Sequence, residues 1–96
     1  MYVAVRQYTG AEALINGVVG KEDAVRQTIS GAPGFVAWYA IKGSGGSLTT
    51  VTLCSEKRGV EESTRRARAW IRENLPGLKM GPPAVTMGEA FLEAVR

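Results

Sequence analysis

The segment FVAWYAIK at residues 35–42 is apolar on both of its faces, and no other feature constrains the fold as strongly. Side chains alternate across a β-strand. One face is therefore expected to carry Phe35, Ala37, Tyr39 and Ile41, and the other Val36, Trp38 and Ala40. A strand with two apolar faces is stable when both are covered. The sequence thus predicts a sheet that is shielded on both sides.

A β-hairpin is predicted from the residues that follow. The glycine-rich connection GSGGS comes next, and then residues 48–54, LTTVTLC, which are rich in threonine and branched side chains. A short glycine-containing link between two such runs is typical of a hairpin. A phosphate-binding loop would need a helix directly after its glycines. We therefore interpret GSGGS as a turn.

Two helices and two further strands complete the order βαββαβ. Residues 2–8, YVAVRQY, alternate as a strand does. Apolar residues recur at helical spacing from Ala11 to about Ser30, where Gly17 and Gly20 weaken the helix and favour a kink. A second helix presents one apolar or small face and ends at Pro76 and Gly77; this face is formed by Val60, Ser63, Ala67, Trp70, Ile71 and Leu75. The last strand is predicted over Val85–Val95.

This order predicts an α+β fold, the ferredoxin-like plait, as one domain over residues 1–96 with both helices on one face of a four-stranded antiparallel sheet. The last strand is also apolar on both sides, because Val85, Met87 and Phe91 oppose Ala90 and Leu92. Two helices cover only one face. The second cover is most economically another copy of the same sheet, so we expect a homodimer packed sheet against sheet.

Composition excludes several kinds of site. The chain of 96 residues has no histidine and a single cysteine, Cys54, so a zinc site, a histidine base and an internal disulfide are not expected. We expect neither a metal nor another cofactor. No apolar run is long enough to cross a membrane, and the first residues do not read as a secretory leader, so a cytoplasmic location is expected.

The net charge of +3 suggests nucleic-acid binding only weakly. Arginines gather in the second predicted helix, but Glu61 and Arg65, and Glu62 and Arg66, stand four residues apart in the order that favours helical ion pairs. A solvated helix face that pairs its own charges is the preferred interpretation. A plait that binds nucleic acid through Arg65 and Arg66 is the weakest of the functional hypotheses, and no nucleic-acid partner is expected.

Four segments carry a resemblance to a known family. They are GAPGFVAWYAIK, SEKRGVEES after the third strand, RRARAWIRENL in the second helix and the closing PPAVTMGEAF. Through them, over essentially the whole chain, the sequence resembles the antibiotic biosynthesis monooxygenase-like superfamily of dimeric α/β-barrel proteins, in its branch of stand-alone members of undefined function. The resemblance implies two plaits joined through their sheets, with a ligand cleft between helices and sheet in each subunit.

Members of this superfamily include cofactor-free oxygenases of phenolic polyketides, haem-degrading proteins and many proteins with no assigned activity. This chain departs from them in two ways. It has no histidine to serve as an axial haem ligand, and its first strand, YVAVRQY, holds no asparagine at the matching place. No catalytic residue is carried over from the family.

The candidate binding residues are Trp38, Tyr39, Trp70 and Arg6. Oxygenation without a cofactor needs a substrate that becomes electron-rich by losing a phenolic or enolic proton. The three aromatic side chains can stack on such a ring, Arg6 can hold its oxyanion, and a glutamate or tyrosine can take the proton. The leading hypothesis is a homodimer that binds a small aromatic or apolar molecule and oxygenates it.

Each candidate also has a structural interpretation. Trp38 and Tyr39 are adjacent on a strand and face opposite ways, so one at most lines a given cleft and the other packs in the dimer seam. Trp70 lies where a core anchor of the second helix belongs, and Arg6 can pair with a glutamate across the sheet or the dimer. The alternative hypothesis is accordingly a non-catalytic ligand-binding or structural dimer, whose cleft its own side chains fill.

Overall fold

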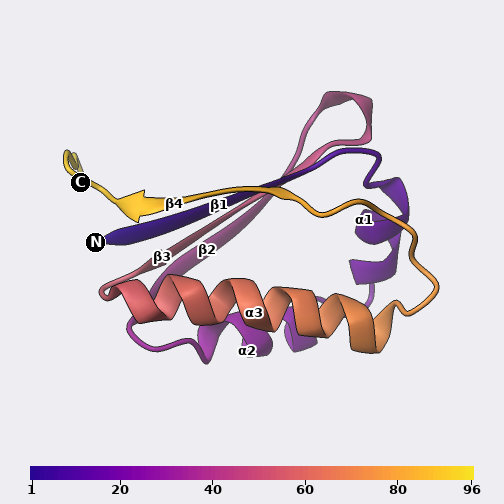
Figure 1. Ribbon diagram of the computed structural model, residues 1–96, viewed down its shortest axis with the longest axis horizontal. Helices are drawn as coiled ribbons and strands as arrows, with labels where there is room; N and C mark the ends of the chain where they lie inside the picture. The colour runs from indigo at the N-terminus through magenta and orange to yellow at the C-terminus, as the bar shows by residue number, and fades with distance from the viewer.

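The computed structural model describes residues 1–96, which form a four-stranded antiparallel sheet with helices packed on one face (Figure 1). The strands are β1 (Tyr2–Tyr8), β2 (Phe35–Lys42), β3 (Leu48–Cys54) and β4 (Ala84–Glu89), and their order across the sheet is β2-β3-β1-β4. This is the predicted ferredoxin-like plait. The bounds of β1, β2 and β3 agree with those expected from the sequence.

The helices are α1 (Glu12–Val18), α2 (Glu22–Ser30) and α3 (Lys57–Asn74), and a single 3-10 turn at Ser44–Gly46 closes the hairpin. In Figure 1, α2 and α3 lie under the sheet and α1 lies at one end of it. The core is between these layers, in clusters around Ala4 and Cys54, around Leu14 and Leu48, and around Trp70. None of the helices combines the length and the apolar character needed to cross a bilayer.

The single kinked helix predicted from Ala11 to Ser30 is in fact two helices. Val19 is extended, with ψ 126°, and Gly20 adopts a positive φ of 88°, so the helical path stops after α1. Glycine adopts this conformation without steric cost. A new helix then begins at Glu22, whose carboxylate accepts a hydrogen bond of 2.9 Å from the Gly20 N–H. The break turns α1 away from α2.

Two other predicted bounds are corrected. Helix α3 begins at Lys57, three residues before the expected Val60. Strand β4 ends at Glu89, so the prediction of a strand up to Val95 was wrong. The Ala90 N–H still donates a hydrogen bond to the Met1 carbonyl. Beyond Ala90 the chain has no strand partner. In this last segment Phe91, Leu92 and Val95 are almost fully exposed.

A β-bulge changes which residues of β2 share a face. The pairing of β2 with β3 shifts between Phe35 and Ala37, which leaves Val36 outside the ladder. Phe35 and Trp38 consequently both pack toward the helices around Trp70, and the prediction that Phe35 shares a face with Ala37 and Tyr39 was wrong. A bulge inserts one residue into a strand and so reverses its alternation.

The sheet buries polar side chains under the helices and leaves apolar ones on its other face. Arg6, Thr50 and Thr52 are buried on the helix side of β1 and β3. The alternate positions of three strands face away from the helices. Two of them are polar, Gln7 and Thr49, and the other seven are apolar or aromatic: Val3, Val5, Val51, Leu53, Ala37, Tyr39 and Ile41. Tyr39 and Ile41 are more than half exposed. We call these seven residues the open face.

The charges of α3 are paired within the helix only in part, through Glu62, Arg65 and Arg66. Glu62 binds both Arg65, at 2.5 Å, and Arg66, at 3.6 Å. The expected ion pair between Glu61 and Arg65 does not form, because Arg65 turns to the carboxylate three residues away. Arg66 also donates a hydrogen bond of 3.1 Å to the Thr28 carbonyl and so ties α3 to α2.

The close contact between the start of α3 and the sheet gives a first prediction. A Cβ added at Gly59 would press on the Pro33 carbonyl oxygen and lie 2.8 Å from the Cys54 Cβ. Overpacking of this kind costs about 1–3 kcal/mol, more than the roughly 1 kcal/mol that alanine contributes as a better helix former. We expect Gly59→Ala to lower the free energy of unfolding by up to about 2 kcal/mol in urea titrations. Gly81→Ala, where nothing lies within 4 Å, is the control. Equal stability of the two variants would contradict the contact.

The thiol of Cys54 gives a second prediction. Its side chain is fully buried, and burial raises the pKa of the thiol, which the nearby Glu56 carboxylate reinforces. Since the thiolate is the reactive form, the native protein should react with Ellman's reagent at pH 8 at least about tenfold more slowly than the urea-unfolded chain. Equal rates in the two states would show that Cys54 is accessible.

Candidate functional site

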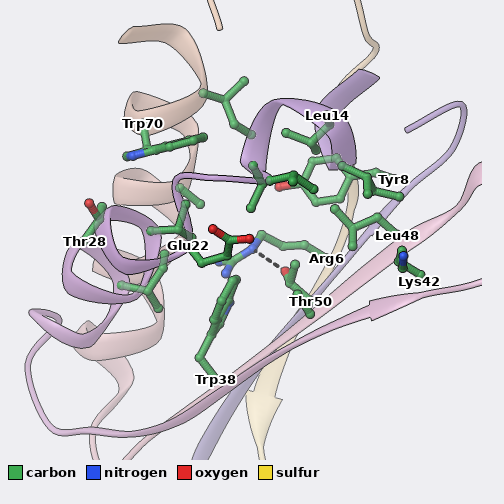
Figure 2. A pocket seen from close by; sticks show the side chains of 18 residues that line it. Arg6, Tyr8, Leu14, Glu22, Thr28, Trp38, Lys42, Leu48, Thr50 and Trp70 are labelled. Atoms are coloured by element: carbon green, nitrogen blue, oxygen red, sulfur yellow. Dashed lines mark hydrogen bonds between the residues drawn. The ribbon is translucent and has the colours of Figure 1, made fainter. Parts of the chain in front are cut away.

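A largely apolar cavity lies between the helices and the sheet (Figure 2). Its volume is about 240 Å³, and its lining comes from β1, β2, β3 and all three helices. The residues that shape it most are Arg6, Tyr8, Leu14, Glu22, Trp38, Thr50 and Trp70. A cavity of about 150 Å³ suffices for benzene. The space therefore fits one aromatic ring or a fused pair of rings.

Arg6 reaches the cavity from the middle of β1 and is held there by three threonines. Its Nε donates to the Thr50 Oγ1 at 3.1 Å, its Nη2 to the Thr52 Oγ1 at 2.9 Å and its Nη1 to the Thr64 Oγ1 at 2.9 Å. Thr50 and Thr52 of β3 lie on the same side of the sheet as Arg6 of β1, because Arg6 and Thr50 are register partners. Figure 2 draws the Thr50 bond as a dashed line.

The charge of Arg6 has no carboxylate partner. The residue is 1% exposed, and no carboxylate oxygen lies within 4.0 Å of its nitrogens. Burial lowers the pKa of its guanidinium. An ion removed from water costs several kcal/mol unless an opposite charge compensates it. The interpretation that Arg6 pairs with a glutamate across the sheet was therefore wrong for this chain by itself.

Trp38 and Trp70 contribute aromatic surface from opposite sides of the cavity (Figure 2). Trp38 comes from β2, and its buried indole Nε1 has no hydrogen-bond partner. Trp70 comes from α3 and is 9% exposed, packed with Val25 and Ile29. Trp70 is thus both a core anchor of α3 and a cavity-lining residue.

Tyr39 lies apart from the other candidate residues. It follows Trp38 on β2 and points to the open face, where it is 59% exposed. The structure therefore brings Arg6, Trp38 and Trp70 to one cavity and leaves Tyr39 on the opposite side of the sheet. Alternation turns the two adjacent side chains to opposite faces, as predicted. Both nevertheless line a wide groove of about 810 Å³ between β2 and α2, so the prediction that at most one of them lines a given cleft was wrong.

Three further ionisable residues line the cavity, Tyr8, Glu22 and Lys42, and neither Tyr8 nor Glu22 is poised as a strong base. Burial raises the pKa of the Tyr8 phenol, although Arg6 and Arg68 oppose the shift. Glu22 has a pKa below its usual value because its carboxylate accepts hydrogen bonds from its own backbone N–H and that of Gly20. No cluster of three or more histidine, cysteine, aspartate or glutamate side chains forms anywhere in residues 1–96.

A second cleft of about 360 Å³ lies on the other side of Arg6. It is bounded by α3, the start of β4 and the loop before it, and Arg6 and Tyr8 belong to both spaces. This cleft lacks both tryptophans and contains a second arginine, Arg68. We place the candidate site in the cavity, because it offers aromatic surface and a polar floor together.

Sequence reasoning missed the three threonines that hold Arg6. A signal was present in LTTVTLC, where Thr50 and Thr52 alternate with Val51 and Leu53. Threonine is also a common strand residue, so its abundance indicated only β-structure. The register of β1 with β3, and the helix that brings Thr64 over the sheet, reveal its second role.

Solved structures of similar fold cover nearly the whole chain. A dimeric ferredoxin-like protein from an uncultured marine organism has a TM-score of 0.72 and 12% identity over 99% of this chain and 97% of its own. A monooxygenase from the ActVA-Orf6 gene of Streptomyces coelicolor, in complex with nanaomycin D, has a TM-score of 0.69 and 19% identity over 99% of this chain and 91% of its own.

A candidate antibiotic biosynthesis monooxygenase from Nitrosomonas europaea has a TM-score of 0.70 and 7% identity over 94% of this chain and 89% of its own. No protein-family model matches the sequence, and no curated protein matches it either. At such identities the likeness concerns the fold. The chain therefore shares the fold of antibiotic biosynthesis monooxygenase-like proteins, as the resemblance in its sequence indicated.

Proposed function

We propose that this protein is a cytoplasmic homodimeric α/β barrel that binds a small flat aromatic molecule in the cavity and oxygenates it without a cofactor. The observation that carries the proposal is the cavity itself, which joins the surfaces of Trp38 and Trp70 to the buried guanidinium of Arg6. Its volume of about 240 Å³ limits the substrate to one or two rings.

Cofactor-free oxygenation places specific demands on these residues. A phenolic substrate must lose its proton before dioxygen attacks the ring; one oxygen atom then enters as a carbonyl, the other leaves as water, and the substrate supplies the electrons. Arg6 is placed to stabilise the anion in a site with little water. Glu22 is the carboxylate that would accept the proton, since it lines the same cavity.

A second function, binding without catalysis, is favoured by the ionisable groups. A general base works best when its pKa lies near the working pH. The pKa of Glu22 is lowered and that of Tyr8 is raised, so both are shifted away from neutrality. A protein that stores, carries or senses the same aromatic ligand needs the cavity and Arg6 but no base.

The homodimer belongs to the proposal because of the open face. Seven mostly apolar side chains lie there together, and no part of the chain covers them. A patch of this kind on a protein surface usually marks an interaction site. A second copy of the sheet offers the same apolar surface in return, as a two-fold interface requires. The dimeric ferredoxin-like protein of similar fold supports this choice of partner.

Oxygen consumption tests the catalytic proposal. We expect the protein to consume dioxygen with a dihydroxynaphthalene or a single-ring hydroquinone, and Trp38→Ala to lower the rate at least about tenfold because the ring loses its stacking surface. Val36→Ala is the matched control, since Val36 belongs to the same strand as Trp38 but does not line the cavity. An oxygen electrode measures the rate. Ligand binding without oxygen consumption by any member of the panel would favour the non-catalytic function.

Light scattering tests the dimer. We expect a dimer at micromolar concentration, and we expect Val51→Glu to give a monomer because it places a charge in the middle of the open face. Val19→Glu is the control: Val19 is 66% exposed and lies between α1 and α2, away from that face. A wild-type monomer would contradict the proposed interface.

A further inference from the structure

We propose that the ligand of the cavity carries a carboxylate, which Arg6 and Trp38 bind at the polar end of an otherwise apolar site. This inference rests on the proposed function for the location of the site, and it adds the chemical class of the ligand. It follows from three observations: unused hydrogen-bond donors, a charge without a partner, and the shape of the surrounding surface.

The donors that remain unused on two residues that line the cavity, Arg6 and Trp38, are the first observation. A guanidinium has five N–H groups, and the three threonines accept from only three of them. One N–H therefore remains on each of Nη1 and Nη2. The indole Nε1 of Trp38 is buried and has no partner either. Buried donors are seldom left unpaired in folded proteins, so these donors are available to a group that accepts several hydrogen bonds.

The charge of Arg6 is the second observation. Arg6 donates all three of its hydrogen bonds to neutral hydroxyl groups, which do not neutralise its charge. The other ionisable side chains of the cavity do not supply a counter-charge: Glu22 forms no ion pair with Arg6, the phenol of Tyr8 stays protonated, and Lys42 is itself a cation. A negatively charged ligand would supply the counter-charge that no side chain gives to Arg6.

A carboxylate meets these demands better than a neutral phenol does. Near pH 7 an ordinary carboxyl group is ionised, whereas an ordinary phenol, with a pKa of about 10, is neutral. Two carboxylate oxygens also accept the paired N–H groups of a guanidinium, and such charge-assisted bonds are about twice as strong as neutral ones. The apolar wall formed by Leu14, Trp70 and Ile71 suits the remainder of the ligand, which we infer to be a flat hydrocarbon ring system.

Matched probes test this inference by calorimetry on the full chain at pH 7. 2-Naphthoate, 2-naphthamide and 2-naphthol have the same two-ring body and differ only in the polar group. We expect 2-naphthoate to bind at least tenfold more tightly than either neutral compound. In Arg6→Met this preference should disappear, because the variant keeps the length of the side chain and removes its charge and donors.

Two further variants separate the roles of the donors and the place of binding. Trp38→Phe retains a stacking ring but loses the N–H, so it should weaken 2-naphthoate several-fold and 2-naphthamide less, because the bond to an ionised acceptor is about twice as strong as the bond to a neutral one. Arg68→Met removes the arginine that belongs to the second cleft alone, and it should preserve the preference. Trp38→Phe and Arg68→Met also keep the test decisive if Arg6→Met does not fold.

The outcomes distinguish this inference from the proposed function. Equal affinity for the three probes would overturn the carboxylate assignment and leave an aromatic-binding cavity. A preference for 2-naphthoate that survives Arg6→Met, or one that Arg68→Met abolishes, would overturn the assignment to Arg6 in this cavity. Failure of all three probes to bind would overturn both the inference and the proposed function.

Discussion

The buried guanidinium of Arg6 is the constraint on which the arrangement of this molecule depends. A guanidinium that is 1% exposed requires hydrogen-bond acceptors at fixed positions around it, and one strand, β3, and one helix, α3, provide them through Thr50, Thr52 and Thr64. The hydrogen bonds from Arg6 therefore join the centre of the sheet to α3. They also keep a polar, charged surface in a place that most folds fill with hydrocarbon.

This polar centre affects the opposite side of the sheet. Since β1 and β3 turn Arg6 and the threonines toward the helices, alternation turns their branched apolar residues outward. The side of the sheet that faces the helices holds a cavity, and the other side holds the apolar open face. Ligand binding on one side and association with a second copy on the other would then be two results of a single pattern along the strands.

Much of the fold could be predicted from the sequence, because its signals are local. The alternation in YVAVRQY, the glycine-rich turn after FVAWYAIK and the apolar spacing around Trp70 each depend on residues close together in the chain. The errors arose where a local pattern did not determine the backbone. The apolar residues after Glu89 look like strand residues but have no strand to pair with, and Val36 forms a bulge that spacing alone does not reveal.

The candidate site was predictable only in part. Arg6, Trp38 and Trp70 were identified as residue types able to bind an aromatic anion, and alternation alone separated Trp38 from Tyr39. Their meeting in one cavity depends on the register between strands and on the packing of α3 against the sheet. The roles of Thr64 and Glu22 depend on the same long-range contacts, since neither residue is near Arg6 in the sequence.

The sequence by itself determined the order of the elements, the absence of histidine chemistry and the apolar character of both faces of β2, because each of these is a property of residue identity and spacing. Only the tertiary structure decided that Arg6 is buried without an anion and that the indole of Trp38 lacks a partner. The physical reason is that hydrogen bonding and charge compensation are satisfied, or left unsatisfied, between residues tens of positions apart, and only the folded chain brings those residues together.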